Sequence, residues 1–287
     1  MKWEKALQKV VIQLTTECLK ENVEILADTL RSQGVEVCLK LPDVRQRAEG
    51  VLLLTDDVKL LRAWENCAVR GALLLHEDNR QEDFTGIRYA LEQVDELDRE
   101  ELDRIYRRLH GLPWRILETE RCAVREITVG DVDRMYEIYA EPSITEYMDD
   151  LYADREKEKD YTLEYIRNMY GFYGYGMWVV EEKHSGRVIG RAGIEPCGEE
   201  AELGYVIARP WQRLGIAGEV CRAILKYGFE ELGLDRISAR VQSENQPSKR
   251  LLQKLGFQKY SETAESDVIM EKWICKKDFL CFLSKTL

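Results

Sequence analysis

One short segment has the residue types needed to hold a phosphate group. It is Gln212-Arg213-Leu214-Gly215-Ile216-Ala217, and it lies between the apolar run 201–208 and an amphipathic run that ends near Leu232. This order predicts a strand, a tight turn and the first turn of a helix. The first N–H groups of a helix lack intrahelical partners and carry partial positive charge, which suits a phosphate. An ordinary turn between a strand and a helix is the alternative.

Two further motifs follow this turn in the chain. Asn245-Gln-Pro-Ser248 comes about 30 residues later, and Leu255-Gly256-Phe257 closes the next predicted helix. Together the three motifs resemble those of the GCN5-related N-acetyltransferases (GNAT), in the branch that includes ribosomal-protein N-terminal acetyltransferases. That family's pattern is [Q/R]-x-x-G-x-[G/A], then N-x-x-[A/S], then L-G-F. The resemblance covers residues 120–277. It implies an enzyme that moves an acetyl group from acetyl-CoA to a primary amine, by direct transfer in a ternary complex.

The same resemblance assigns residues to the binding of coenzyme A. The backbone N–H groups near Val206 to Ala208 would point at the thioester carbonyl and act as oxyanion donors. Asn245 would cap the next helix and contact the pantetheine arm. Lys249 and Arg250 could meet the 3′-phosphate, or be solvated helix charges. The expected cofactor-binding residues are Val206, Ile207, Ala208, Gln212, Arg213, Leu214, Gly215, Ile216, Ala217, Asn245 and Ser248.

Acetyl transfer also needs a base for the ammonium and benefits from an acid for the departing thiolate. Glu202, on the strand that would face the cofactor, is the first candidate for the base, and Glu195 is the second; either could instead be a rim charge. Many family members carry a tyrosine acid in the last helix, where this chain has Leu252. Ser248 is the candidate acid, with a purely structural hydroxyl as the alternative. Cys221 lies at a core-like helix position, so we expect packing and no acyl-enzyme.

The acceptor amine would bind near the first helices of this half. Glu146, Tyr147, Asp150 and Tyr175 supply carboxylates and aromatic rings, which suit an ammonium group. A solvated acidic helix start explains the same residues equally well. The acceptor therefore stays open between a peptide N-terminus and a small amine.

Composition limits the class of protein. Among 287 residues the net charge is −11, with 45% hydrophobic side chains, eight cysteines and three histidines. No basic face is apparent, which disfavours nucleic-acid binding. No cysteine belongs to a C-x-x-C pair, which argues against a zinc site or a disulfide scaffold. We therefore expect no metal site. The absence of a membrane-span pattern or signal peptide predicts a cytoplasmic protein. A homodimer is compatible with the sequence.

The chain divides into two predicted α/β (α+β) domains. A helix over 95–110 ends at Gly111 and Pro113, so we expect a first domain at 1–112, a linker at 113–119 and an acetyltransferase domain at 120–287. The second domain should have the GNAT fold, with a mixed, mostly antiparallel sheet flanked by helices. The first should be a small Rossmann-like layer, with a helix over Val10 to Gln33 and strands near 35–41, 50–55 and 71–75.

The first domain also weakly resembles haloacid dehalogenase-like domains over residues 48–92, where an apolar strand ends in Thr55. It lacks the aspartate nucleophile motif of that family, which predicts a non-catalytic domain. Asp56 and Asp57 are expected to cap a helix rather than bind a metal. A coenzyme A-binding sensor or assembly module without turnover is the competing function for the whole chain.

Overall fold

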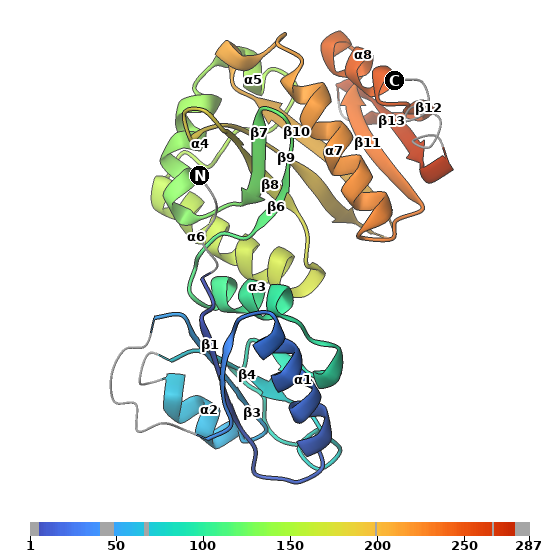
Figure 1. Ribbon diagram of the computed structural model, residues 1–287. Helices are drawn as coiled ribbons and strands as arrows, with labels where there is room; N and C mark the ends of the chain where they lie inside the picture. The colour runs from blue at the N-terminus through green and yellow to red at the C-terminus, as the bar shows by residue number, and fades with distance from the viewer. Residues whose placement is uncertain (1–5, 41–48, 66–68, 199, 266, 279–287) are drawn as a thin grey trace. The chain divides into compact units, whose positions relative to one another are not determined.

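The chain folds into two compact units, Met1–Trp114 and Arg115–Leu287, which are drawn in Figure 1. The computed structural model describes residues 6–40, 49–65, 69–198, 200–265 and 267–278. The stretch expected to be a linker, 113–119, contains strand β6 (Arg115–Glu118), which pairs with the second unit's sheet. The second unit therefore begins within that stretch.

The first unit is built on a five-stranded sheet in which every neighbouring pair is parallel. The strand order is β2-β1-β3-β4-β5, the order of flavodoxin-like doubly wound sheets. Its strands are β1 (Lys9–Gln13), β2 (Glu36–Cys38), β3 (Val51–Thr55), β4 (Gly71–Leu74) and β5 (Ala90–Leu91). Its helices are α1 (Lys20–Ser32), α2 (Val58–Glu65), η1 (Val94–Glu96) and α3 (Arg99–Leu109).

The start of this unit corrects the predicted helix over Val10 to Gln33. The structure has strand β1 there and only then helix α1. Val10, Val11 and Ile12 are buried in β1, which lies between β2 and β3. These β-branched side chains favour a pleated, buried strand, and that preference outweighs the apparent helical spacing.

The two aspartates after β3 have different roles. Asp57 accepts hydrogen bonds from the backbone N–H of Lys59 and Leu60, at 2.8 and 3.1 Å, and so caps α2 as predicted. Asp56 instead accepts from the N–H groups of Thr15 and Thr16, at 2.7 and 3.0 Å. It therefore fixes the loop after β1.

The second unit contains an eight-stranded mixed sheet. Its order is β12-β13-β11-β10-β9-β8-β7-β6, and only β10 and β11 run parallel. The predicted mixed, mostly antiparallel sheet is therefore confirmed. The other strands are β7 (Cys122–Glu126), β8 (Met177–Glu182), β9 (Arg187–Cys197), β10 (Glu200–Ile207), β11 (Arg236–Gln242), β12 (Gln258–Glu265) and β13 (Val268–Lys276).

Helices cover both faces of this sheet (Figure 1). On one face α7 packs on Trp178 and Leu203, and on the other α4 packs on Val179 and Val206. The helical segments are η2 (Val129–Asp131), α4 (Val132–Tyr139), α5 (Pro142–Thr145), α6 (Arg155–Tyr165), the π-helical η3 (Ile166–Tyr173), η4 (Arg209–Trp211), α7 (Ile216–Glu230) and α8 (Gln246–Lys254).

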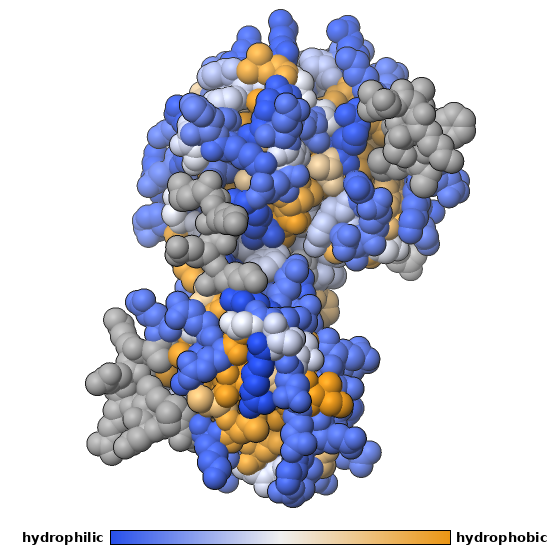
Figure 2. Space-filling view, viewed as in Figure 1, coloured by the Kyte–Doolittle hydropathy of each residue, from blue (hydrophilic) through white to orange (hydrophobic). Residues whose placement is uncertain are grey.

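Hydrophilic side chains predominate on the face shown in Figure 2, with hydrophobic groups exposed between them. The most exposed large hydrophobic side chains of the second unit include Phe172 and Tyr260. Within the described ranges, no helix has both the length and the apolar composition needed to cross a bilayer.

Candidate active site

The site is centred on a gap between β10 and β11. These parallel strands are in register at one pair only, Glu202 with Ser238, whereas β9 pairs with β10 along its whole length. Beyond Glu202 one edge of β10 therefore faces a groove of about 1290 Å³, which α7 and α8 also line. An unpaired strand edge offers backbone N–H and C=O groups to an extended ligand.

The backbone alternation of β10 decides which amides face this groove. The Ala208 N–H donates to Ile189 O at 2.8 Å, so it is already used by β9, and the prediction of Ala208 as an oxyanion donor is wrong. N–H groups alternate in direction along an antiparallel strand, so Val206 N–H also faces β9. The amides of Tyr205 and Ile207 face the groove instead.

The turn before α7 has the backbone geometry of an anion site. Gly215 has φ 82° and Arg213 has φ 60°, both in the left-handed region, and no side chain caps α7. The free N–H groups at this helix start are therefore available to a ligand. A Cβ on Gly215 would contact only an Arg121 nitrogen, at 3.6 Å. Glycine is thus favoured there by its positive φ, and Gln212 closes the turn by donating to Ile207 O at 2.9 Å.

Cationic side chains from distant segments line the groove. Arg213, Arg222 and Arg250 face it, and none of them forms an ion pair with the residues that the structure describes. Lys249 does not belong to this set, because it is paired with the buried Glu271 at 2.9 Å. Its assignment to a 3′-phosphate is therefore corrected, while Arg250 stays available.

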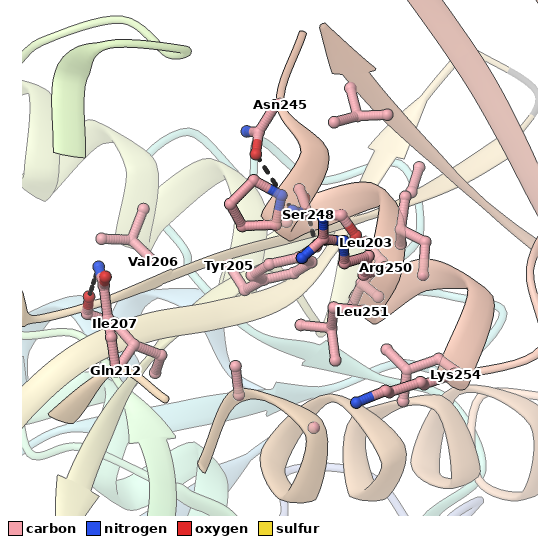
Figure 3. Close-up of a pocket in the computed structure, with 18 of the residues that line it drawn as sticks. Leu203, Tyr205, Val206, Ile207, Gln212, Asn245, Ser248, Arg250, Leu251 and Lys254 are labelled. Atoms are coloured by element: carbon pink, nitrogen blue, oxygen red, sulfur yellow. Dashed lines mark hydrogen bonds between the residues drawn. The ribbon is translucent and has the colours of Figure 1, made fainter. Parts of the chain in front are cut away.

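The start of α8 brings a serine and a tyrosine together. Asn245 Oδ1 accepts from Ser248 N at 3.1 Å, so the predicted cap is confirmed. The Ser248 hydroxyl is hydrogen-bonded to the Tyr205 hydroxyl from β10, as Figure 3 shows beside the groove. Burial raises the pKa of Tyr205 well above its ordinary value, and Ser248 opposes this rise, so the phenol stays protonated. Sequence reasoning missed Tyr205.

The two candidate bases lie side by side, because Glu202 of β10 is directly opposite Glu195 of β9. Glu202 lines the groove and is 3.2 Å from Arg240 Nε. Burial raises the pKa of Glu202 above its ordinary value, although Arg240 lowers it in part. Glu195 accepts a hydrogen bond of 2.6 Å from the Tyr165 hydroxyl.

Glu195 lines a second, smaller cavity of about 220 Å³ on the α4 and α6 side of the sheet. Glu158, Arg191, Tyr161 and Tyr165 line it as well. The cavity and the groove share four lining residues, which are Met148, Gly204, Tyr205 and Val206. They therefore adjoin each other at this stretch of β10.

The expected acceptor residues are not all at these openings. Glu146 and Tyr147 line the groove. Asp150 is exposed and accepts from the Leu151 N–H at 2.7 Å, and Tyr175 packs against the hydrophobic core with its ring 6.5 Å from that of Tyr173. Neither Asp150 nor Tyr175 lines the groove or the cavity.

Comparison with known proteins agrees with this geometry. Residues 121–258 match the model of the acetyltransferase (GNAT) domain family. The uncharacterized N-acetyltransferase YoaA of Bacillus subtilis is 32% identical over 150 residues, which are 50% of this chain and 83% of that protein. The family match lies within the second unit, and it gives no support to a haloacid dehalogenase-like first unit.

Solved structures share the fold. A GNAT-family acetyltransferase from Bacillus anthracis aligns with a TM-score of 0.50 at 22% identity, over 56% of this chain and 98% of that one. The ribosomal-protein-S5-alanine acetyltransferase from Vibrio fischeri aligns with a TM-score of 0.50 at 18% identity, over 57% and 97%. The motifs, the gap between β10 and β11 and these relatives lead to one conclusion: this chain belongs to the GNAT family and is an N-acetyltransferase.

Proposed function

We propose that this enzyme transfers the acetyl group of acetyl-CoA to a primary amine within a ternary complex. One observation carries the proposal: the groove between β10 and β11 extends from the turn at Gly215 to the stretch of β10 that also lines a cavity with two carboxylates. Bound in the groove, acetyl-CoA supplies the acetyl group as a reactive thioester. The uncapped start of α7 and Arg213, Arg222 and Arg250 suit its phosphates by charge.

The groove side of β10 stabilises the transition state. The N–H groups of Tyr205 and Ile207 face the gap and can donate to the thioester oxygen as negative charge develops there. Such preorganised donors stabilise the transition state more than the ground state, which is the requirement for catalysis.

Protons are moved by carboxylate and hydroxyl groups on either side of β10. Glu195 accepts a proton from the acceptor ammonium, because it lines the cavity that meets the groove; Glu202, its neighbour, is the second candidate. The neutral amine nitrogen forms the C–N bond as the C–S bond breaks. The Ser248 hydroxyl gives a proton to the departing thiolate and regains one from Tyr205. The nitrogen loses its second proton as the amide forms, and water returns this proton to Tyr205.

Direct transfer is supported by the state of the thiol on the helix that follows the phosphate turn. Cys221 is fully buried on the core side of α7, and burial strongly raises the pKa of its thiol. A protonated thiol without access to substrate is a poor nucleophile. No acyl-enzyme on Cys221 is therefore proposed.

We also infer that the first unit is non-catalytic. The carboxylate of Asp56 is occupied by the Thr15 and Thr16 amides, and Gln13 ends β1 where a nucleophilic aspartate would be needed. Among the described residues, no cluster of histidine, cysteine and carboxylate side chains could hold a metal ion.

Calorimetric titration with acetyl-CoA tests the proposal. We expect binding by the native protein and its loss in Gly215→Glu, because a carboxylate there repels the phosphates. Gly233→Glu is the matched control, since Gly233 has a positive φ of 67° just beyond the other end of α7 and no neighbour within 4 Å of an added Cβ. A folded native protein that does not bind acetyl-CoA would contradict the proposal. Binding without thiol release across a panel of amines would favour a coenzyme A-binding module instead.

A further inference from the structure

The cavity on the α6 side of the sheet holds charges of both signs. Arg191 of β9 lines it together with the carboxylates of Glu158 and Glu195. An acceptor site that served only to attract an ammonium group would need no guanidinium, because that group repels cations. Arg191 therefore favours a ligand that carries a negative group.

Arg191 lacks a carboxylate partner in the described part of the chain. Its Nε is buried and has no hydrogen-bond partner, and its Cζ lies 5.1 Å from the centre of the Tyr139 ring. The ring holds the guanidinium by a cation–π contact without neutralising it. Arginine donors bind carboxylates in a two-pronged geometry, so a ligand carboxylate would satisfy this side chain.

The two carboxylates are held firmly at the same cavity. Glu195 accepts from the Tyr165 hydroxyl, which itself accepts from Met177 N at 2.6 Å. Glu158 is only 7% exposed and accepts from Tyr152 N at 3.0 Å. Neither forms an ion pair with a described cationic side chain, so both can attract a ligand ammonium.

The cavity between these charges has room for a small molecule. Residues 191, 193 and 195 lie on one face of β9, and Gly193 pairs directly with Gly204 of β10. Met177 and the backbone of Gly176 pack against these two glycines, and the ligand space lies beside Gly204, which lines the cavity together with Arg191 and Glu195. The volume of about 220 Å³ is below the 300–1000 Å³ of pockets for drug-sized ligands.

We propose that the acceptor is a small zwitterion, an α-amino acid, whose carboxylate binds Arg191 and whose ammonium lies between Glu195 and Glu158. This inference rests on the proposed acetyl transfer. A polyamine would bring positive charge to Arg191, and a peptide N-terminus has no carboxylate at that position. Transfer converts the amino acid and acetyl-CoA into an N-acetylamino acid and coenzyme A: a C–N bond forms, the C–S bond breaks, and the ammonium's proton passes to Glu195.

The test compares matched acceptors on the full-length protein. Release of free coenzyme A is measured with each of the amino acids that occur in proteins and with the α-amide of each. Spermidine and a peptide that begins with alanine serve as further acceptors. One charge-assisted contact predicts that kcat/KM for the preferred amino acid exceeds that for its amide by about 10- to 100-fold. Arg191→Gln should bring this ratio close to one, and Arg191→Lys should restore part of it.

Two controls separate selectivity from folding. Arg187→Gln removes a solvent-exposed arginine at the start of the same strand and should keep the native ratio. Acetyl-CoA titration of each variant reports whether the groove is intact. If the native protein binds acetyl-CoA but acetylates no amino acid, acetylates amides or the peptide equally well, or keeps its ratio in Arg191→Gln, the inference is overturned and acetyl transfer stands. Failure to bind acetyl-CoA overturns the proposed function itself.

Discussion

At the scale of single residues, the hydrogen bond between Tyr205 and Ser248 allows the most direct test of the proposed proton donation to the thiolate. Removing the phenolic hydroxyl in Tyr205→Phe should lower kcat by about 100-fold or more, the range of general acid catalysis. The KM for acetyl-CoA should change little, because the backbone of β10 stays in place. Steady-state kinetics on the preferred amine measures both constants.

The behaviour of the pair distinguishes catalysis from packing. If Ser248 and Tyr205 pass one proton together, Ser248→Ala should cost about as much as Tyr205→Phe, and the double variant little more. The native kcat should fall only above about pH 10, because burial raises the pKa of Tyr205 above that ordinary value and the acid must be protonated. Additive losses, or an unchanged basic limb in Tyr205→Phe, would mean that the pair only packs.

Residue types and spacing predicted part of this site. The turn at Gln212 and Gly215 and the cap at Asn245 were predicted correctly, because both depend on local sequence. Tyr205 and Arg191 were missed because their partners come from other elements: Tyr205 meets Ser248, 43 residues away. Such contacts depend on strand register, because a shift of one residue in the register moves every side chain of a strand to the other face of the sheet.

At the scale of elements, the close approach of β8 and β9 constrains the cavity. A Cβ on Gly193 would lie 2.2 Å from Gly176 O and 2.6 Å from Met177 Cα, both backbone atoms. Gly193→Ala should therefore lower the free energy of unfolding by roughly 1–3 kcal/mol, the cost of overpacking. Urea unfolding measures it. Gly171→Ala is the control, since no atom lies within 4 Å of its added Cβ, and equal stability losses in both variants would argue against the close packing.

The elements were most predictable where the chain marks their ends. The strand predicted at 201–208 and the helix predicted to end near Leu232 lie within a few residues of β10 and α7, because Pro210, Gly215 and Gly233 mark their ends. The failure over Val10 to Gln33 arose where an apolar stretch had no such marker. The π-helical η3 was also not predicted, since such helices are rare.

At the scale of the whole molecule, cationic side chains gather at the groove although the chain as a whole is negatively charged. The chain carries a net charge of −11, and no basic segment stands out along it. Folding nevertheless brings Arg213, Arg222, Arg250 and Lys254 to one groove. Composition could not predict this, because the four residues become neighbours only when α7 packs beside α8. The negative remainder suits an enzyme whose acceptor carries an ammonium group.

We propose that the two compact units unfold as separate domains. Each has its own hydrophobic core, centred on Leu52 and Leu54 in one and on Trp178 and Ile224 in the other. Scanning calorimetry should therefore resolve two transitions. Acetyl-CoA at about 100 times its Kd should stabilise only the second unit, by about 2.7 kcal/mol, because a ligand stabilises the unit that binds it. Gly215→Glu should abolish that shift and leave the other transition in place. A single transition that moves as a whole would mean that the units unfold together, and the first unit would then contribute directly to the stability of the acetyltransferase.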